Sequence, residues 1–427
     1  ISPFDDPAGF KFGKNEDQNV IKTGSYVGNG GTGGPKISLG FEPQWILVKN
    51  TSDIGNWYMF DSLRGIANDH NDAKLSANEV QIEETDAEYI DLNATGFQIV
   101  SANSNVNTDG DIYIYMAIRR PDGYVGKPAD AGTDVFAITA GTSNSDVPGF
   151  VSGFPVDYYF IRPPASTSSW WSQARLTGTK TLKLDDTAAE TTDTNIGFDF
   201  NNGAHDWDGD LSSYQGWLWK RHAGFDVVTY KATGSAMNIS HGLSKIPEMY
   251  WLKNRDDTKP WIIYHKGLNG GTNPNQYYLQ FDADEDGTIN PYADAPTATH
   301  LNIAAGESWT NDTGDDYLAM LFASVDGISK VGSYTGVSSQ LQIRNLGFTP
   351  RFLLVKRVDG TGNWVVFDTT RGWGSGDDKK LFLNTSAAQT TQDVGDPVSS
   401  GGGGFDLYTG NDDFNNTGNE YIYYAHA

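Results

Sequence analysis

The sequence repeats itself about every 100 residues, and this repetition restricts the fold more than any other feature. The segment at residues 22–26 (KTGSY) returns at residues 330–334 as KVGSY. Four similar aromatic segments close successive stretches of the chain, beginning at residues 113, 217, 317 and 421. Because a fixed period marks a recurring structural unit, the chain is expected to contain four related units.

Each repeat is filled by short runs of aromatic and β-branched residues, which favour strands. Tyr113 and Tyr115 stand two positions apart, which places both side chains on one face of a strand. The pattern predicts an all-β fold of tandem β-sandwich (jelly-roll or lectin-like) repeats of about 100 residues. A propeller blade would repeat every ~40–50 residues, so a propeller is disfavoured. Strand exchange between neighbouring units stays open.

The motif spacing sets the expected boundaries. The predicted segments are an extended N-terminal arm (1–21), repeat 1 (22–120), a linker (121–131), a diverged repeat 2 (132–224), repeat 3 (225–327) and repeat 4 (328–427). Ile1 is a poor match to a natural start, so we expect further sequence before it.

Composition narrows the classes of function. The 427 residues carry a net charge of −24, which disfavours binding to the phosphates of nucleic acid or to anionic lipid. No apolar run approaches the ~20 residues of a membrane helix. Cysteine is absent, which excludes disulfides, thiolate metal sites and thiol nucleophiles. Aromatic residues make up 13% of the chain, far more than a disordered acidic chain would carry.

Several motifs together resemble a known family. They are the Gly-Phe-x-Pro segments at 40–43 and 347–350, the Asn-Trp blocks at 56–57 and 363–364, and residues 122–128, 328–336 and 421–427. As a set they resemble a repeated domain of unassigned function in virion and tail-fibre-like proteins of tailed bacteriophages, especially marine and cyanobacterial ones.

The resemblance implies a bacteriophage virion structural protein without enzymatic activity, of the tail-fibre or surface-fibre type. Such a protein would serve assembly and host-surface recognition, with glycans as candidate ligands and other virion proteins as partners. Phage fibres suggest a homo-oligomer, with a trimer as the expectation by analogy. The alternatives are a polysaccharide-degrading tail enzyme, a capsid-surface decoration protein and a secreted adhesin.

One acidic loop is a candidate calcium site, although no cofactor is expected to be required. Asp282, Asp284 and Asp286 alternate before Gly287, as ligands do in calcium loops. An EF-hand would need Glu at its twelfth position, where the chain has Ala293. An acidic hairpin loop explains the same residues without a metal.

Several other groups of charged residues are candidates for catalysis. Residues 84–88 would place three carboxylates on one strand face, as some glycanases do, although a solvated acidic loop is the simpler interpretation. Asp61 with Arg64 recurs as Asp368 with Arg371, and a salt bridge that fixes a turn accounts for both pairs. The seven histidines form no HExxH motif, so a zinc site is not expected.

The tryptophans fall into two groups. Trp45, Trp57, Trp261 and Trp364 occupy repeated positions, which favours packing in a core. Three others have no counterparts and are candidates for stacking on sugar rings, namely Trp207, Trp309 and Trp373.

Overall fold

The computed structural model describes residues 20–120, 125–142, 148–206, 209–281, 290–408 and 410–427. Antiparallel strands dominate them, and the one α-helix is the single turn α1 (Ser104–Asn107). The predicted all-β fold is therefore confirmed. No helix in the described part of the chain has the length and apolar character to span a bilayer.

Four main sheets share one strand order. We name the parts of the chain that carry them units 1 to 4, with residues 21–120, 132–224, 225–327 and 328–427. In each, the first strand pairs with the last, and the last pairs with a long central strand. The main sheet of unit 1 has the order β1 (Ile21–Val27), β8 (Ile112–Arg119), β3 (Pro43–Asn50), β4 (Tyr58–Asp61) and β5 (Lys74–Ser76).

The other three main sheets follow the same order. Unit 2 has β9 (Phe136–Ala140), β16 (Gln215–Trp219), β11 (Tyr158–Arg162), β12 (Trp171–Ala174), β13 (Lys180–Lys183) and β14 (Thr191–Thr192). Unit 3 has β17 (Phe225–Lys231), β22 (Asp316–Phe322), β19 (Met249–Asn254) and β20 (Ile262–His265). Unit 4 has β23 (Ser329–Thr335), β31 (Glu420–His426), β25 (Phe352–Arg357), β26 (Val365–Asp368), β27 (Asp378–Phe382) and β28 (Thr390–Gln392).

A smaller sheet accompanies each main sheet. These sheets are β2 (Lys36–Ser38), β7 (Gly96–Ile99) and β6 (Ile90–Asn93) in unit 1, β10 (Phe150–Val151) and β15 (Gly203–Ala204) in unit 2, β18 (Met237–Ser240) and β21 (His300–Ile303) in unit 3, and β24 (Leu341–Arg344), β30 (Gly404–Leu407) and β29 (Pro397–Val398) in unit 4. In unit 3, Leu321 of β22 shares an apolar core with Ile239 of β18 and Ile303 of β21.

The opposite faces of three main sheets build a second core. Side chains alternate along a strand, so β22 sends Leu321 into its own unit and Met320 to the other side. There the main sheets of units 2, 3 and 4 meet around shared aromatic side chains. Ring contacts join each pair of these units: Tyr158 to Phe225, Phe322 to Tyr424, and Phe136 to Phe352, with centroids 5.8, 4.9 and 5.4 Å apart.

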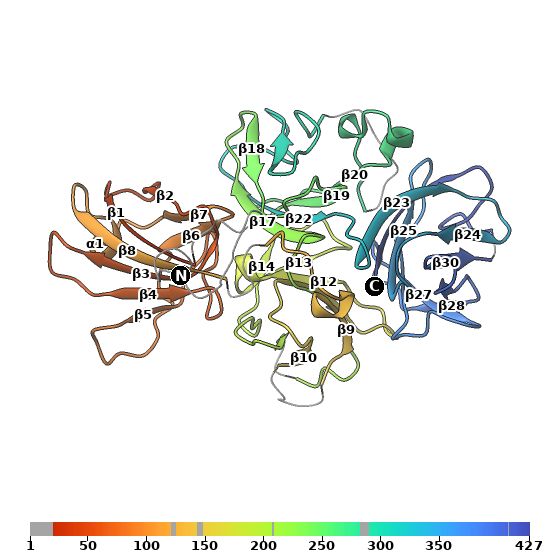
Figure 1. Cartoon of the computed structure of the whole chain (residues 1–427), viewed down its shortest axis with the longest axis horizontal. Coiled ribbons are helices and arrows are strands. Elements are labelled where there is room, and N and C mark those ends of the chain that lie inside the picture. Colours follow the sequence, from red (N-terminus) through yellow and green to blue (C-terminus); the bar gives the residue numbers. More distant parts are fainter. Residues whose placement is uncertain (1–19, 121–124, 143–147, 207–208, 282–289, 409) are drawn as a thin grey trace, which may run out of the picture.

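Unit 1 lies beside this group of three, at the left of Figure 1, and buried ion pairs are among the contacts that join it to the group. The Arg221 guanidinium donates to both carboxylate oxygens of Glu42 at 2.7 and 2.5 Å, and all of these groups are buried. Asp157 lies against Arg120, Arg175 and Arg221 at 3.1 to 3.5 Å. The Coulomb attraction of these three cations offsets the cost of burial and holds the pKa of Asp157 well below its ordinary value.

Candidate functional site

A cleft of about 710 Å³ with both polar and apolar lining separates unit 1 from unit 2. On the unit 1 side it is formed by the turn after β4, and on the unit 2 side by the start of β13 and the loop after β14. Its polar and charged lining includes Ser62, Arg64, Asp69, His70, Asn71, Thr85, Glu88, Thr179, Lys180, Thr192, Thr194 and Asp199. The volume falls in the usual range for small-molecule sites, but this lining is more polar than most.

Three carboxylates gather at the cleft wall. Oxygen atoms of Asp69, Glu88 and Asp91 all lie within 4.8 Å of one another. Asp69 has a positive φ of 64°, a conformation that Asp tolerates better than most residues. Its backbone N–H donates to Asp91 Oδ1 at 3.1 Å, which fixes the turn on the strand β6 that carries Asp91.

Crowding changes the proton affinity of this cluster. Burial, followed by repulsion from Asp69, raises the pKa of Glu88 to about 7. The same two causes raise the pKa of Asp91 to about 7. Protons therefore reside on these groups at a pH where ordinary carboxyls are ionised.

Cations from unit 3 face the cluster and connect it to unit 2. The fully buried Arg255 donates to Asp69 Oδ2 at 3.3 Å and to Glu190 Oε2 at 2.8 Å. Lys231 Nζ lies 2.8 Å from Asp316 and 4.0 Å from Asp69. The cleft wall is therefore a junction of units 1, 2 and 3.

This arrangement permits two kinds of chemistry. A cation could replace the protons, although Ca²⁺ needs six to eight oxygen ligands and Lys231 and Arg255 already compensate part of the charge. A pair of carboxyls could also act as acid and nucleophile, since retaining glycosidases hold theirs ~5–5.5 Å apart. Glu88 has the raised pKa that a general acid requires.

Of the predicted binding residues, the structure describes Trp309 and Trp373, and neither lines this cleft. Asp282, Asp284, Asp286 and Trp207 lie outside the described residues. Trp309 is half-buried, and its ring meets Tyr278 edge-on at 5.9 Å.

The prediction for Trp373 is wrong, because its side chain is 2% exposed. It packs beside Phe367 in the core of unit 4, and its indole N–H donates to Gly395 O at 2.8 Å. A ring buried in this way has no face for a sugar.

The predicted carboxylate array at residues 84–88 is not on one strand face. Glu84 forms an isolated bridge to β5 and pairs with Lys74 at 2.7 Å, whereas Asp86 is exposed. Only Glu88 joins the cluster. Its partners come from a turn and from β6, and neither belongs to a local motif that the sequence could have revealed.

The two predicted turn salt bridges are confirmed. Asp61 accepts from Arg64 Nε at 2.5 Å, and Asp368 accepts from Arg371 Nε at 2.6 Å. In each pair the aspartate also accepts the backbone N–H of its arginine, so the carboxylate closes the turn that follows the strand.

Sequence comparison gives the relationship of the chain to other proteins. The model of one family, described as "Domain of unknown function (DUF7483)", matches residues 15–120 and 133–427. The chain belongs to the DUF7483 family. No curated protein matches the chain. The DUF7483 match covers both walls of the cleft and all three carboxylates of the cluster.

Proposed function

We propose that the chain is a bacteriophage virion structural protein, of the tail-fibre or surface-fibre type, that binds host-surface glycans. The observation that carries the binding role is the cleft between units 1 and 2. Hydroxyl, amide, carboxylate and ammonium groups line it, and these groups match the hydroxyls of a saccharide. The motifs shared with virion proteins support the place in the particle.

Residues of three units are bonded together at the cleft, which suits a ligand that is held against a mechanical force. Arg255 of unit 3 bonds to both Asp69 of unit 1 and Glu190 of unit 2. Buried charges of this kind fix the relative position of the units, because removing one partner leaves the other unpaired. A saccharide in the cleft would therefore contact a preorganised surface.

Glycan binding is tested by calorimetric titration with surface polysaccharide fragments from candidate hosts. Asn71→Ala removes an exposed amide of the cleft, and we expect at least about tenfold weaker binding. Asn238→Ala, an exposed asparagine on β18 of unit 3, is the matched control and should leave binding unchanged. Equal affinities for both variants would remove the cleft from the proposal.

Location is tested separately by immunogold labelling of purified virions. Label on tail fibres or surface fibres supports the structural role, and label spread evenly over the capsid supports a decoration protein. Virions without label would contradict a place in the particle.

The geometry also supports a second candidate, a polysaccharide-degrading enzyme, because Glu88 lies close to Asp69 with a raised pKa. Chromatography of polysaccharide after incubation would show shortened chains, and Glu88→Gln would abolish them. Intact polysaccharide would exclude this candidate for the substrates tested.

A further inference from the structure

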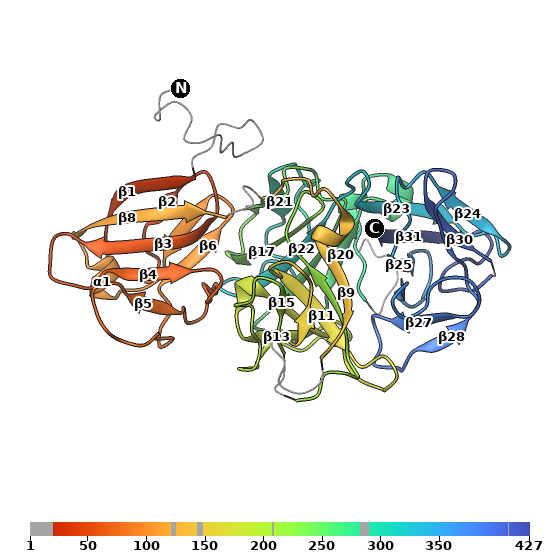
Figure 2. The same cartoon turned by 60° about the horizontal axis from the view of Figure 1, so that its bottom comes forward.

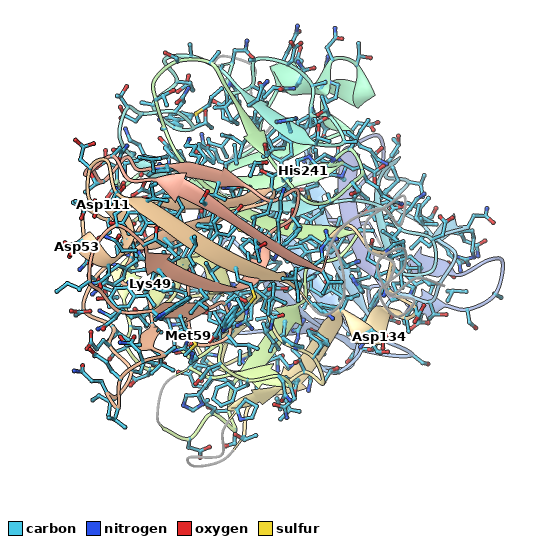
Figure 3. All side chains as sticks on the ribbon, turned by 60° about the vertical axis from the view of Figure 1, so that its left-hand side comes forward. Lys49, Asp53, Met59, Asp111, Asp134 and His241 are labelled. Carbon is cyan, nitrogen blue, oxygen red and sulfur yellow. The ribbon has the colours of Figure 1, made fainter. Side chains whose placement is uncertain are left out.

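Unit 1 exposes the sheet face that units 2, 3 and 4 bury. We call this surface the open face, and it consists of Ile21, Trp45, Leu47, Trp57, Met59, Ile112, Ile114, Met116 and Ile118. Ile21, Ile112 and Trp57 are 52%, 48% and 37% exposed. Figure 2 shows the sheet with no described segment over it, and Figure 3 labels Met59 and Lys49 on it. Apolar patches of this kind usually mark an interaction site.

Strand registers identify the equivalent positions in the other units. Leu47 pairs with Met116 on one side and Met59 on the other. The central residues at the same register are Phe160, Trp251 and Leu354, and all three lie in the shared aromatic core. Unit 1 thus keeps the apolar character of a buried position, and none of the described residues covers it.

Hydrogen bonds close units 2, 3 and 4 into a ring. The indole N–H of Trp170 in unit 2 donates to Phe382 O of unit 4 at 2.8 Å. Trp364 of unit 4 donates to Gln280 O of unit 3 at 3.4 Å, and Trp261 of unit 3 donates to Lys183 O of unit 2 at 2.9 Å. Through these equivalent tryptophans, each unit therefore donates to the next unit and accepts from the one before it.

At two of these contacts, a basic side chain donates to the same neighbouring unit as the indole does. Lys253 Nζ of unit 3 donates to Thr187 O of unit 2 at 3.0 Å. Arg162 Nη2 of unit 2 donates to Ser386 O of unit 4 at 3.2 Å. The equivalent Lys49 of unit 1 donates to Asn50 O and Asp53 O of its own loop.

Unit 1 also holds the matching acceptors. The N–H of Leu184 bonds to Trp170 O, just as the N–H of Ala77 bonds to Trp57 O. These bonds make Ala77 equivalent to Leu184. Ser76 is therefore equivalent to Lys183, and Val80 is equivalent to Thr187. Ala77 and Val80 are exposed, so both acceptor segments lie at the surface.

We propose that unit 1 forms the same ring in trans, with unit 1 of two further copies of this chain. In this trimer Trp57 of one copy donates to Ser76 O of a neighbouring copy. Lys49 of the first copy donates to Val80 O of that same neighbour. The open faces meet at the axis and form an aromatic and aliphatic core. The inference holds whether or not the chain belongs to a virion.

A second copy is favoured over other occupants because donor and acceptor sites lie on the same unit. Contacts between two different patches of one surface generate either a closed ring or an open filament. The internal ring of units 2 to 4 closes after three members, and the equivalent contacts in unit 1 should do the same. A shallow hollow of about 530 Å³ between Leu47, Trp57 and Met116 would be filled by the neighbouring copy.

The first test is the mass of the full chain by analytical ultracentrifugation over a range of concentrations. We expect a species of about 140 kDa, three times the 46.6 kDa chain. Met116→Lys places a charge on the open face and should raise the concentration needed for assembly by at least about a hundredfold. Ile246→Lys is the matched control, since Ile246 is 56% exposed in unit 3, and it should leave the trimer intact. A monomer at every concentration, a dimer, or a trimer that tolerates Met116→Lys would overturn the proposal.

The second test uses the absence of cysteine in the chain. Lys49→Cys combined with Val80→Cys should yield a covalent ladder that ends at three chains after treatment with a short thiol cross-linker. Either single variant should give no covalent trimer, because each contact joins two different positions. A ladder extending beyond three chains would indicate a filament and would contradict the closed ring.

Discussion

The main sheet of unit 1 and those of units 2 to 4 have one strand order and one register, yet their outer faces lie in opposite environments. In units 2 to 4 the face is the wall of an aromatic core. In unit 1 the same positions hold apolar residues at the surface, and buried ions such as Arg221 with Glu42 help to attach the unit to the others. A strand pattern therefore specifies that a face is apolar but not which partner covers it.

The largest expected difference concerns the equivalent tryptophans. Trp364→Ala removes a ring that is 1% exposed, and we expect a loss of about 3–5 kcal/mol in unfolding free energy at any protein concentration. Trp57→Ala should cost less than about 1 kcal/mol when the chain is dilute and should destabilise it only where chains associate. Urea unfolding at two protein concentrations distinguishes the effects of the two substitutions. Equal losses for both variants in dilute solution would show that the faces do not differ.

The two turn salt bridges test the same difference between unit 1 and unit 4, with a smaller expected loss of stability. Asp368 is fully buried and accepts from Arg371 and from the Trp217 indole of unit 2, at 2.6 and 3.1 Å. Asp368→Asn should cost about 2–3 kcal/mol, because it leaves a buried guanidinium without its counter-charge. Asp61→Asn should cost less than about 1 kcal/mol, because that carboxylate is partly solvated. Thermal unfolding measures both, and a reversed order would refute the assignment of the ring interior.

The smallest expected effect is a pH dependence of the junction between unit 1 and the ring. Asp91 has a folded-state pKa of about 7, above its unfolded value of ~4, so the folded protein binds more protons between these limits. The stabilisation from this proton is complete below pH ~4 and is lost as the pH rises through about 7. Asp91→Asn imitates the protonated acid, and we expect a gain of about 1–2 kcal/mol at pH 8 with little change at pH 4. Melting curves of both proteins at the two pH values test this, and an equal shift at both would contradict the proposed cause.

The sequence predicted the strand content, because aromatic and β-branched runs have the period of strands. It also predicted the pairs Asp61 with Arg64 and Asp368 with Arg371, since a spacing of three residues is a local property. The cluster of Asp69, Glu88 and Asp91 could not be predicted in this way, because only the packing of a turn against β6 brings these residues together. Trp373 was misassigned for the opposite reason, since a tryptophan without a counterpart in other repeats can still fill a core.

Because units 2 to 4 are parts of one chain, equivalent positions in their ring can hold different residues. A ring of identical copies does not allow this. The position of Asp368 in unit 4 is occupied by Ala174 in unit 2 and by His265 in unit 3, so three residues have diverged at one site around one axis. In a ring of three unit 1 copies, a single codon change alters all three sites at once. A mutation on the open face therefore changes three side chains around one axis, whereas a mutation in unit 2, 3 or 4 changes one side chain of each internal ring.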